Sequence, residues 1–120
     1  MSRLALVRLA AALCFLAVAL GAFGAHALKD TLQSSGMHEV WNKAGLYHFL
    51  HGVALLALAL YGGGNRAVSF LFVAGILLFS GSLYTMALIP QSRDWLGAIT
   101  PLGGLCFLVG WAWLVIWPKL

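Results

Sequence analysis

The chain has 120 residues, of which 62% are hydrophobic and only 8% are charged. A soluble domain usually carries about a quarter charged residues, so this chain lacks the polar surface that water requires. The formal net charge is +4, but the seven Lys and Arg residues are scattered singly along the sequence. These residues form no basic patch of the kind that would indicate a nucleic-acid partner. Positive charge flanking membrane spans is the better interpretation.

The charged residues divide the chain into four spans that contain no Asp, Glu, Lys or Arg: Leu9–Leu28, Ala44–Asn65, Ala67–Ser92 and Trp95–Pro118. A helix needs about 20 residues to cross the hydrocarbon of a bilayer, so each span is long enough. Strands of a membrane barrel alternate apolar and polar residues, and these runs do not. The sequence therefore predicts an all-α membrane protein with a single domain over residues 1–120 and transmembrane helices at about 5–28, 39–61, 66–89 and 96–117.

The first span has the basic start, apolar centre and Ala25-His26-Ala27 ending of a secretory signal peptide. Its apolar run is longer than that of a signal peptide, however. Ala17, Gly21 and Ala25 also form a ridge of small residues suited to helix packing. We expect the first helix to be retained.

Short connections join the later helices. Gly62–Asn65 reads as a tight break, Pro90–Asp94 separates the last two helices, and Lys29–Lys43 is the one substantial loop. Short connections make neighbouring helices antiparallel, which predicts an up-down-up-down bundle. The side that holds the N-terminus carries four of the seven basic residues, so we expect both termini in the cytoplasm.

Two histidines lie in the motif YHFLHG at the start of the second predicted helix. His48 and His51 are three residues apart and share a helical face. Burying an unpaired polar group in hydrocarbon is costly, so both rings should face the bundle interior. Because the first two helices are antiparallel, His26 and Glu39 are expected near the same end.

Two interpretations of the histidines remain open. His26, His48 and His51 could ligate a metal or haem or relay protons. Alternatively, the rings hydrogen-bond between helices and hold the bundle together. The spacing lacks the built-in carboxylate of an HExxH motif, so the second interpretation is favoured and no cofactor is predicted.

Hydroxyl groups and glycines gather in the last two helices. Ser80, Ser82 and Tyr84 could line a polar pocket beside the histidines, or could belong to an ordinary packing seam. No Ser/His/Asp set makes either serine a nucleophile, because Asp94 belongs to a loop. Cys14 and Cys106 do not form a CxxC pair and are interpreted as packing residues.

These patterns give two groups of candidate residues. The candidate polar pocket comprises His26, Glu39, His48, His51, Ser80, Ser82 and Tyr84. The candidate helix-packing positions are small residues: Ala17, Gly21, Ala25, Gly81, Thr85, Gly103 and Gly104.

Four ordered blocks carry a resemblance to a known family. GAFGAHAL, YHFLHGVALL, FSGSLY and LGAITPLGG followed by GW resemble the bacterial family known as domain of unknown function 423, over about Gly21 to Trp111. Relatives of that family include a small mitochondrial transmembrane protein of animals. The resemblance implies a small multi-pass protein of the bacterial inner membrane and no particular activity.

Three classes of function follow. The first is an accessory or interaction protein whose polar residues are mainly structural, partnered by membrane lipid, by further copies of itself or by other membrane proteins. The second is a protein that binds or transports a small molecule, a lipid or an ion. The third is a metal or haem protein that uses the three histidines. An enzymatic activity is not indicated.

Overall fold

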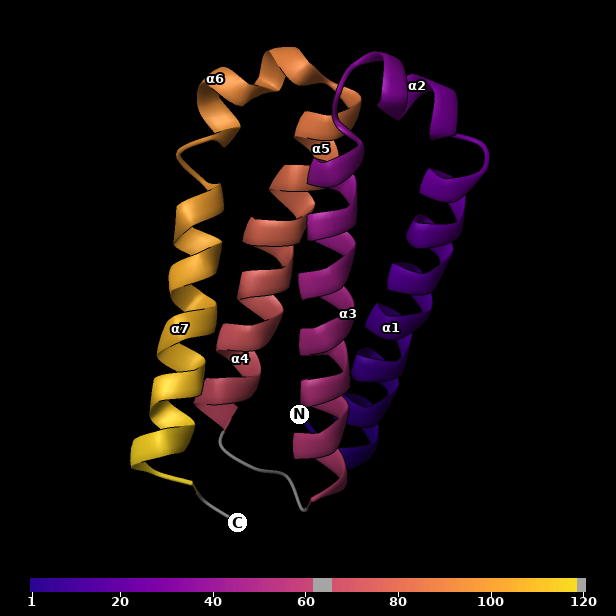
Figure 1. Ribbon diagram of the computed structural model, residues 1–120. Coiled ribbons are helices and arrows are strands. Elements are labelled where there is room, and N and C mark those ends of the chain that lie inside the picture. The colour runs from indigo at the N-terminus through magenta and orange to yellow at the C-terminus, as the bar shows by residue number, and fades with distance from the viewer. Residues whose placement is uncertain (62–65, 119–120) are drawn as a thin grey trace.

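The computed structural model describes residues 1–61 and 66–118, and within them every regular element is a helix. The predicted turn at Gly62–Asn65 lies outside the described residues, as does Lys119. The first long helix, α1 (Arg3–Ala25), is followed by the short α2 (Lys29–Ser34) and the long α3 (His38–Leu60). The N-terminus and the C-terminal end of α7 lie at the same end of the molecule (Figure 1).

The second half of the chain is less regular. A third long helical segment consists of α4 (Arg66–Gly75), the π-helical turn η1 (Ile76–Ser80) and α5 (Gly81–Leu88). The 3-10 turn η2 (Pro90–Ser92) and the short α6 (Arg93–Leu96) follow, and α7 (Thr100–Ile116) ends the described helices. The chain bends by 60° between Pro90–Leu96 and α7.

The helix ends have local causes. Gly36 has a φ of +71° directly after α2, which suits glycine and lets the chain turn into α3. The segment predicted as a loop therefore contains a short helix. Pro101 lies in the first turn of α7, where its missing N–H removes no helical hydrogen bond.

Within residues 1–61 and 66–118, three helices are long and apolar enough to cross a membrane: α1, α3 and the continuous segment from Arg66 to Leu88. The bent pair of Pro90–Leu96 and α7 can count as a fourth span. Large apolar side chains cover the outside, among them Phe15 at 77% exposure and Val115 at 82%. Such a surface suits lipid rather than water. The expectation of an all-helical membrane protein is confirmed.

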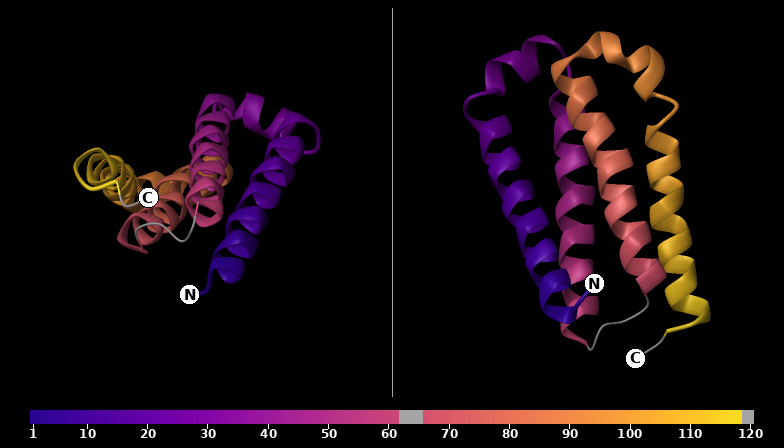
Figure 2. Two further views of the ribbon diagram at one scale, coloured as in Figure 1. Left: turned by 90° about the horizontal axis from the view of Figure 1, so that it is seen from below. Right: turned by 180° about the vertical axis from the view of Figure 1, so that it is seen from behind.

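The helices stand in a row rather than around a closed centre. Figure 2 shows α1 at one side, next to α3, with α4 and then α7 beyond it. α1 makes its main contacts with α3, whereas α7 packs on α4 and η1. Within the described residues the buried apolar side chains form three clusters, each of which joins several elements: Ala44, Leu83, Met86 and Leu96; Val68, Phe72, Ile76 and Phe107; and Leu32, Trp41 and Ala87. α3 lies between α1 and α4 and carries the buried His48 and His51.

Glycines set the closest approaches between helices. A Cβ on Gly103 of α7 would collide with the backbone of η1 at Leu78 and Phe79. A Cβ on Gly24 of α1 would collide with the indole of Trp41. Both contacts exist only because a hydrogen occupies the place of a side chain.

Candidate functional site

His51 lies between α3 and α7 with only 2% of its surface exposed. Its Nε2 atom is 3.0 Å from the indole nitrogen of Trp111, and its Nδ1 atom is 2.8 Å from the Tyr47 carbonyl oxygen. An indole N–H can only donate and a carbonyl can only accept. Nε2 must therefore accept and Nδ1 must carry the proton. His51 is a neutral imidazole with both nitrogens paired.

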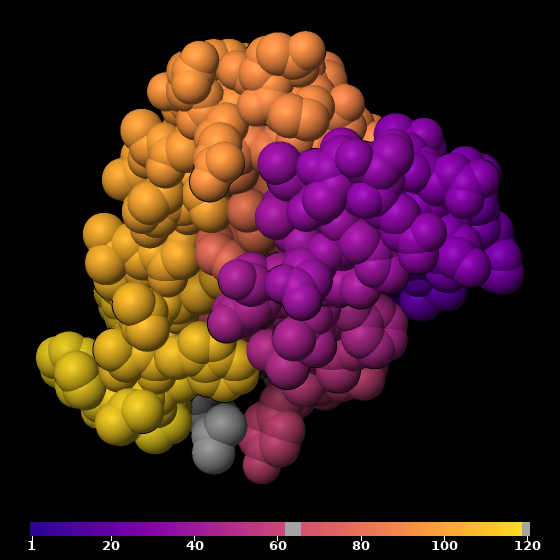
Figure 3. All heavy atoms as spheres, turned by 45° about the horizontal axis from the view of Figure 1, so that its top comes forward, coloured from indigo at the N-terminus to yellow at the C-terminus, as the bar shows by residue number. Residues whose placement is uncertain are grey.

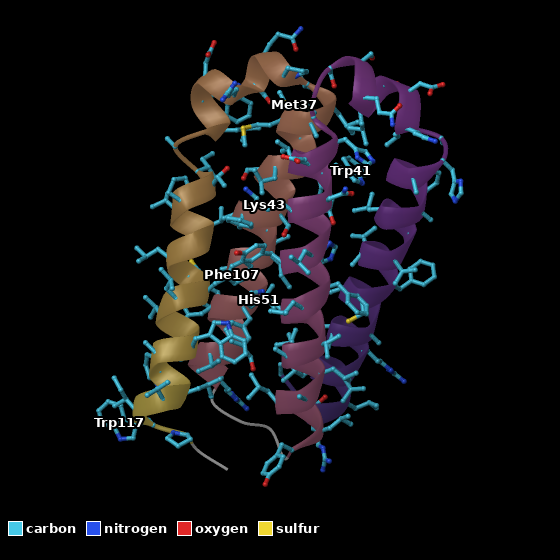
Figure 4. The ribbon with its side chains drawn as sticks, in the orientation of Figure 1. Met37, Trp41, Lys43, His51, Phe107 and Trp117 are labelled. Atoms are coloured by element: carbon cyan, nitrogen blue, oxygen red, sulfur yellow. The ribbon has the colours of Figure 1, made fainter. Side chains whose placement is uncertain are left out.

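The same ring is also packed between aromatic side chains. It stacks on Phe107, with ring centroids 3.6 Å apart and an interplanar angle of 12°. The edge of Phe72 meets it at a centroid distance of 5.2 Å. Figure 4 shows His51 and Phe107 side by side between α3 and α7. Stacking and two hydrogen bonds leave the His51 ring a single orientation.

His48 lies one turn away and faces a different neighbour. Its Nδ1 atom is 3.0 Å from the Tyr84 hydroxyl of α5, and the side chain is 2% exposed. Its Nε2 atom has no hydrogen-bond partner within the described residues. The backbone of Leu13 on α1 faces the ring without meeting hydrogen-bond geometry. His48 thus joins α3 to α5 and retains one unused nitrogen.

The hydroxyl groups of the third span are also paired. Ser80 donates to the Ala44 carbonyl of α3 at 2.8 Å, and Ser82 is hydrogen-bonded to the Thr100 hydroxyl of α7. Thr85 donates back to the Gly81 carbonyl of its own helix. Ser80 and Ser82 therefore bind the third span to helices on either side of it.

The candidate pocket residues divide into two groups. His48, His51, Ser80, Ser82 and Tyr84 all make hydrogen bonds within the helix row. His26 is exposed just beyond the end of α1, and Glu39 is exposed in the first turn of α3. Among the described residues no three His, Cys, Asp or Glu side chains are grouped as metal ligands would be.

The predicted helix-packing residues also fall into two groups, those that are closely packed and those that are not. Ala17 is buried, but Gly21 has nothing within 4 Å of a built Cβ and Ala25 is exposed. The buried small residues of α1 are Ala10, Ala17 and Gly24. Gly103 packs tightly on η1, whereas Gly104 and Gly81 meet their nearest neighbours only at ordinary contact distances.

Sequence reasoning missed the part that tryptophans play. Trp41 is only 2% exposed and donates to the Leu20 carbonyl of α1 at 3.0 Å, so it joins α3 to α1. Trp111 of α7 donates its indole N–H to Nε2 of His51. The sequence does contain one indication of this contact: Phe107 and Trp111 lie four residues apart and therefore share a helical face.

A groove opens beside this polar region. It has a volume of about 520 Å³ and is bounded by α3, η1 and α7, with Tyr47, His51, Phe79, Phe107 and Trp111 among its lining residues. Figure 3 shows the recess between α3 and α7, with atoms of the third span at its floor. Its size falls in the range of small-molecule sites.

The described part of the chain has only helices as regular elements, with three or four apolar spans and a lipid-compatible surface, and this defines a multi-pass membrane protein. The chain belongs to the family described as "Protein of unknown function (DUF423)", whose model matches residues 20–104. The resemblance noted in the sequence is thereby confirmed.

Its relatives carry membrane-protein names. A UPF0382 membrane protein of Staphylococcus saprophyticus is 47% identical over 105 residues, which cover 84% of this chain and 85% of the relative. The UPF0382 membrane protein YwdK of Bacillus subtilis is 40% identical, covering 84% of this chain and 85% of that protein. The UPF0382 inner membrane protein YgdD of Escherichia coli is 42% identical, with shares of 85% and 79%. No solved structure matches the chain. The expected membrane location agrees with these names.

Proposed function

We propose that this protein is an accessory protein of the inner membrane, a single domain of four antiparallel spans with both termini in the cytoplasm and no catalytic chemistry of its own. It would act by contact with a partner membrane protein or a second copy. One observation carries the proposal: four buried polar side chains hydrogen-bond between helices, although Nε2 of His48 has no partner among the described residues. His51, Ser80 and Ser82 each have their partners on neighbouring segments.

The lipid-facing surface supports an interaction role. In the row arrangement α1 touches mainly α3, so much of α1 and α7 is left uncovered by the rest of the chain. Phe15 on α1 and Leu108 on α7 are 77% and 68% exposed. Helices in lipid associate by close packing, and such outer faces are available for it.

Cysteine cross-linking in native membranes tests this role. Single cysteines would replace Phe15 or Leu108 in a chain carrying Cys14→Ala and Cys106→Ala, followed by mild oxidation. We expect the cysteine on one of the two outer helices to give a disulfide-linked product of constant mass. The variant with its cysteine on the other outer helix serves as the matched control. Monomer at both positions, and at further lipid-facing positions around the row, would contradict an interaction role.

A second candidate function, binding of a lipophilic small molecule, is favoured by the groove between α3 and α7. Four aromatic side chains and the fixed His51 ring line it. Gly104 also lines this groove, and Gly104→Phe would fill it. Organic extraction and mass spectrometry of the purified protein should then find a copurified lipophile in the parent chain and none in Gly104→Phe. Gly21→Phe, at a position with open space around it, is the control. Equal recovery from all three proteins would reject this function.

A further inference from the structure

A second groove lies between the beginnings of α1 and α4. Its volume is about 500 Å³. Leu6 and Leu9 of α1 line it on one side, with Phe70 and Val73 of α4 on the other. Arg3 and Arg66 line the same groove. Seen from behind, the N-terminus lies between the lower ends of these two helices (Figure 2).

The two arginines lie at one end of an otherwise apolar wall. Arg3 is the first residue of α1 and Arg66 the first of α4, whereas the apolar lining residues come one to two turns further along each helix. From Arg3 to Leu9 the rise is about 9 Å along the helix axis. A molecule that fits both parts has a charged head and an apolar tail of at least that length.

The charge at this end of the protein is positive. Arg3, Arg8 and Arg66 lie at this end of the protein. The acidic residues lie elsewhere: Asp30 in α2, Glu39 in the first turn of α3 and Asp94 in α6. Those elements are at the opposite end (Figure 1). The nearby hydrocarbon has a low dielectric, so an anion near the groove is attracted strongly.

We propose that this groove binds a glycerophospholipid with a net negative headgroup. Arg3 and Arg66 hold the phosphate and one acyl chain lies against Leu6, Leu9, Phe70 and Val73. A guanidinium has five N–H donors and matches phosphate oxygens in pairs. Arg3 spends one donor on the Leu60 carbonyl at 2.6 Å, which fixes its side chain over the end of α3 and leaves donors for a phosphate.

The headgroup charge is the discriminating feature. A phosphatidylcholine carries the same phosphate together with a cationic amine, which two arginines would repel. A free phosphoester has the anion but gains nothing from the four apolar side chains. Basic pockets between membrane helices are suited to anionic headgroups for these reasons.

Native mass spectrometry of the full-length protein in detergent tests the proposal. The probes are dioleoyl phosphatidylglycerol, dioleoyl phosphatidylcholine and soluble glycerol phosphate. We expect one retained phosphatidylglycerol per chain and markedly weaker retention of the other two. Arg66→Gln should weaken retention about fivefold, the factor set by one basic residue near a lipid surface.

Two controls separate this site from general attraction. Arg8→Gln removes the same charge from α1 at a residue outside the groove lining and should lower retention much less than Arg66→Gln. Val73→Trp fills the groove while keeping both arginines and should also lower retention. Equal loss in Arg66→Gln and Arg8→Gln would overturn the proposal, because it would show a diffuse charge effect. Equal retention of the two phospholipids, or glycerol phosphate retained as well as phosphatidylglycerol, would overturn it as well.

Discussion

The indole N–H of Trp111 lies 3.0 Å from Nε2 of His51 and joins the last helix to the centre of the row. Because Nδ1 of the same ring is held by the Tyr47 carbonyl, the bond requires the neutral tautomer with its proton on Nδ1. Replacement of His51 by Leu removes both hydrogen bonds. We expect it to lower the free energy of unfolding by about 1 kcal/mol, the usual scale for such bonds in membranes. Unfolding in mixed micelles of increasing dodecyl sulfate fraction measures the change.

A double-mutant cycle isolates the contact itself. Trp111→Phe keeps an aromatic ring beside Phe72, whose centroid is 4.9 Å from that of Trp111, but removes the donor. The coupling energy between His51→Leu and Trp111→Phe should be about 0.6 kcal/mol, the average for interhelical bonds of this kind. Strictly additive effects would show that the bond contributes nothing and that the stacking on Phe107 positions the ring.

Adjacent glycines of α7 should respond differently to the same substitution. A Cβ at Gly103 meets the backbone of η1, which cannot rotate away, so Gly103→Ala must push two spans apart. Overpacking of this kind costs about 1–3 kcal/mol. At Gly104 the nearest atoms belong to the Phe79 side chain at 3.7 Å, so Gly104→Ala should change stability little. The same unfolding assay compares the two, and equal effects would rule out the close backbone approach.

The attachment of α1 depends on Gly24 in a comparable way. Gly24→Ala places a methyl group inside the volume of the Trp41 indole, whose N–H holds the Leu20 carbonyl. We expect weakened packing of α1 on α3 and faster proteolysis of α1 in detergent. Gly21→Ala, where the built Cβ has no neighbour within 4 Å, is the matched control. Loss of α1 protection in the control alone would mean that the ridge predicted from sequence is the packing face after all.

These glycines mark where sequence reasoning reached its limit. Small residues occur so often in α1 that several ridges are equally compatible with the pattern. The choice is made by Trp41, because an indole needs one flat, unobstructed surface and finds it at Gly24. A spacing rule applied to α1 alone does not contain that information, since it belongs to the partner helix.

For the polar residues, too, only part of the arrangement could be predicted from the sequence. The cost of an unpaired imidazole in hydrocarbon is a property of the residue, so inward-facing histidines could be proposed from sequence alone. The hydrogen-bond partners of these histidines could not be predicted in this way. The π-helical turn at Ile76–Ser80 inserts an extra residue per turn and so rotates the face presented by the following helix. Nothing in the letters ILLFS signals that turn, yet it lies directly before the segment that carries Ser82 and Tyr84.

The final prediction concerns the number of spans and their direction. α7 has 17 residues and a length of about 26 Å, slightly short of the hydrocarbon thickness, and the preceding segment meets it at a bend of 60°. If this bent pair crosses the membrane, both termini lie on one side. Basic residues are enriched on the cytoplasmic side of membrane spans, so from Arg3, Arg8 and Arg66 at this end we expect that side to be the cytoplasm. Single cysteines, Ser2→Cys, Lys119→Cys and Gln33→Cys, each in a Cys14→Ala, Cys106→Ala chain, report the side through an impermeant maleimide applied to spheroplasts.

We expect labelling of Gln33→Cys in intact spheroplasts, and labelling of Ser2→Cys and Lys119→Cys only after permeabilisation. Each incorrect assumption would give a different labelling pattern. Labelling of both termini from outside would keep four spans and reverse their direction. Labelling of one terminus alone would mean an odd number of spans. In that case the bent pair would be the segment that fails to cross, because α1, α3 and Arg66–Leu88 each reach 23 residues without such a break.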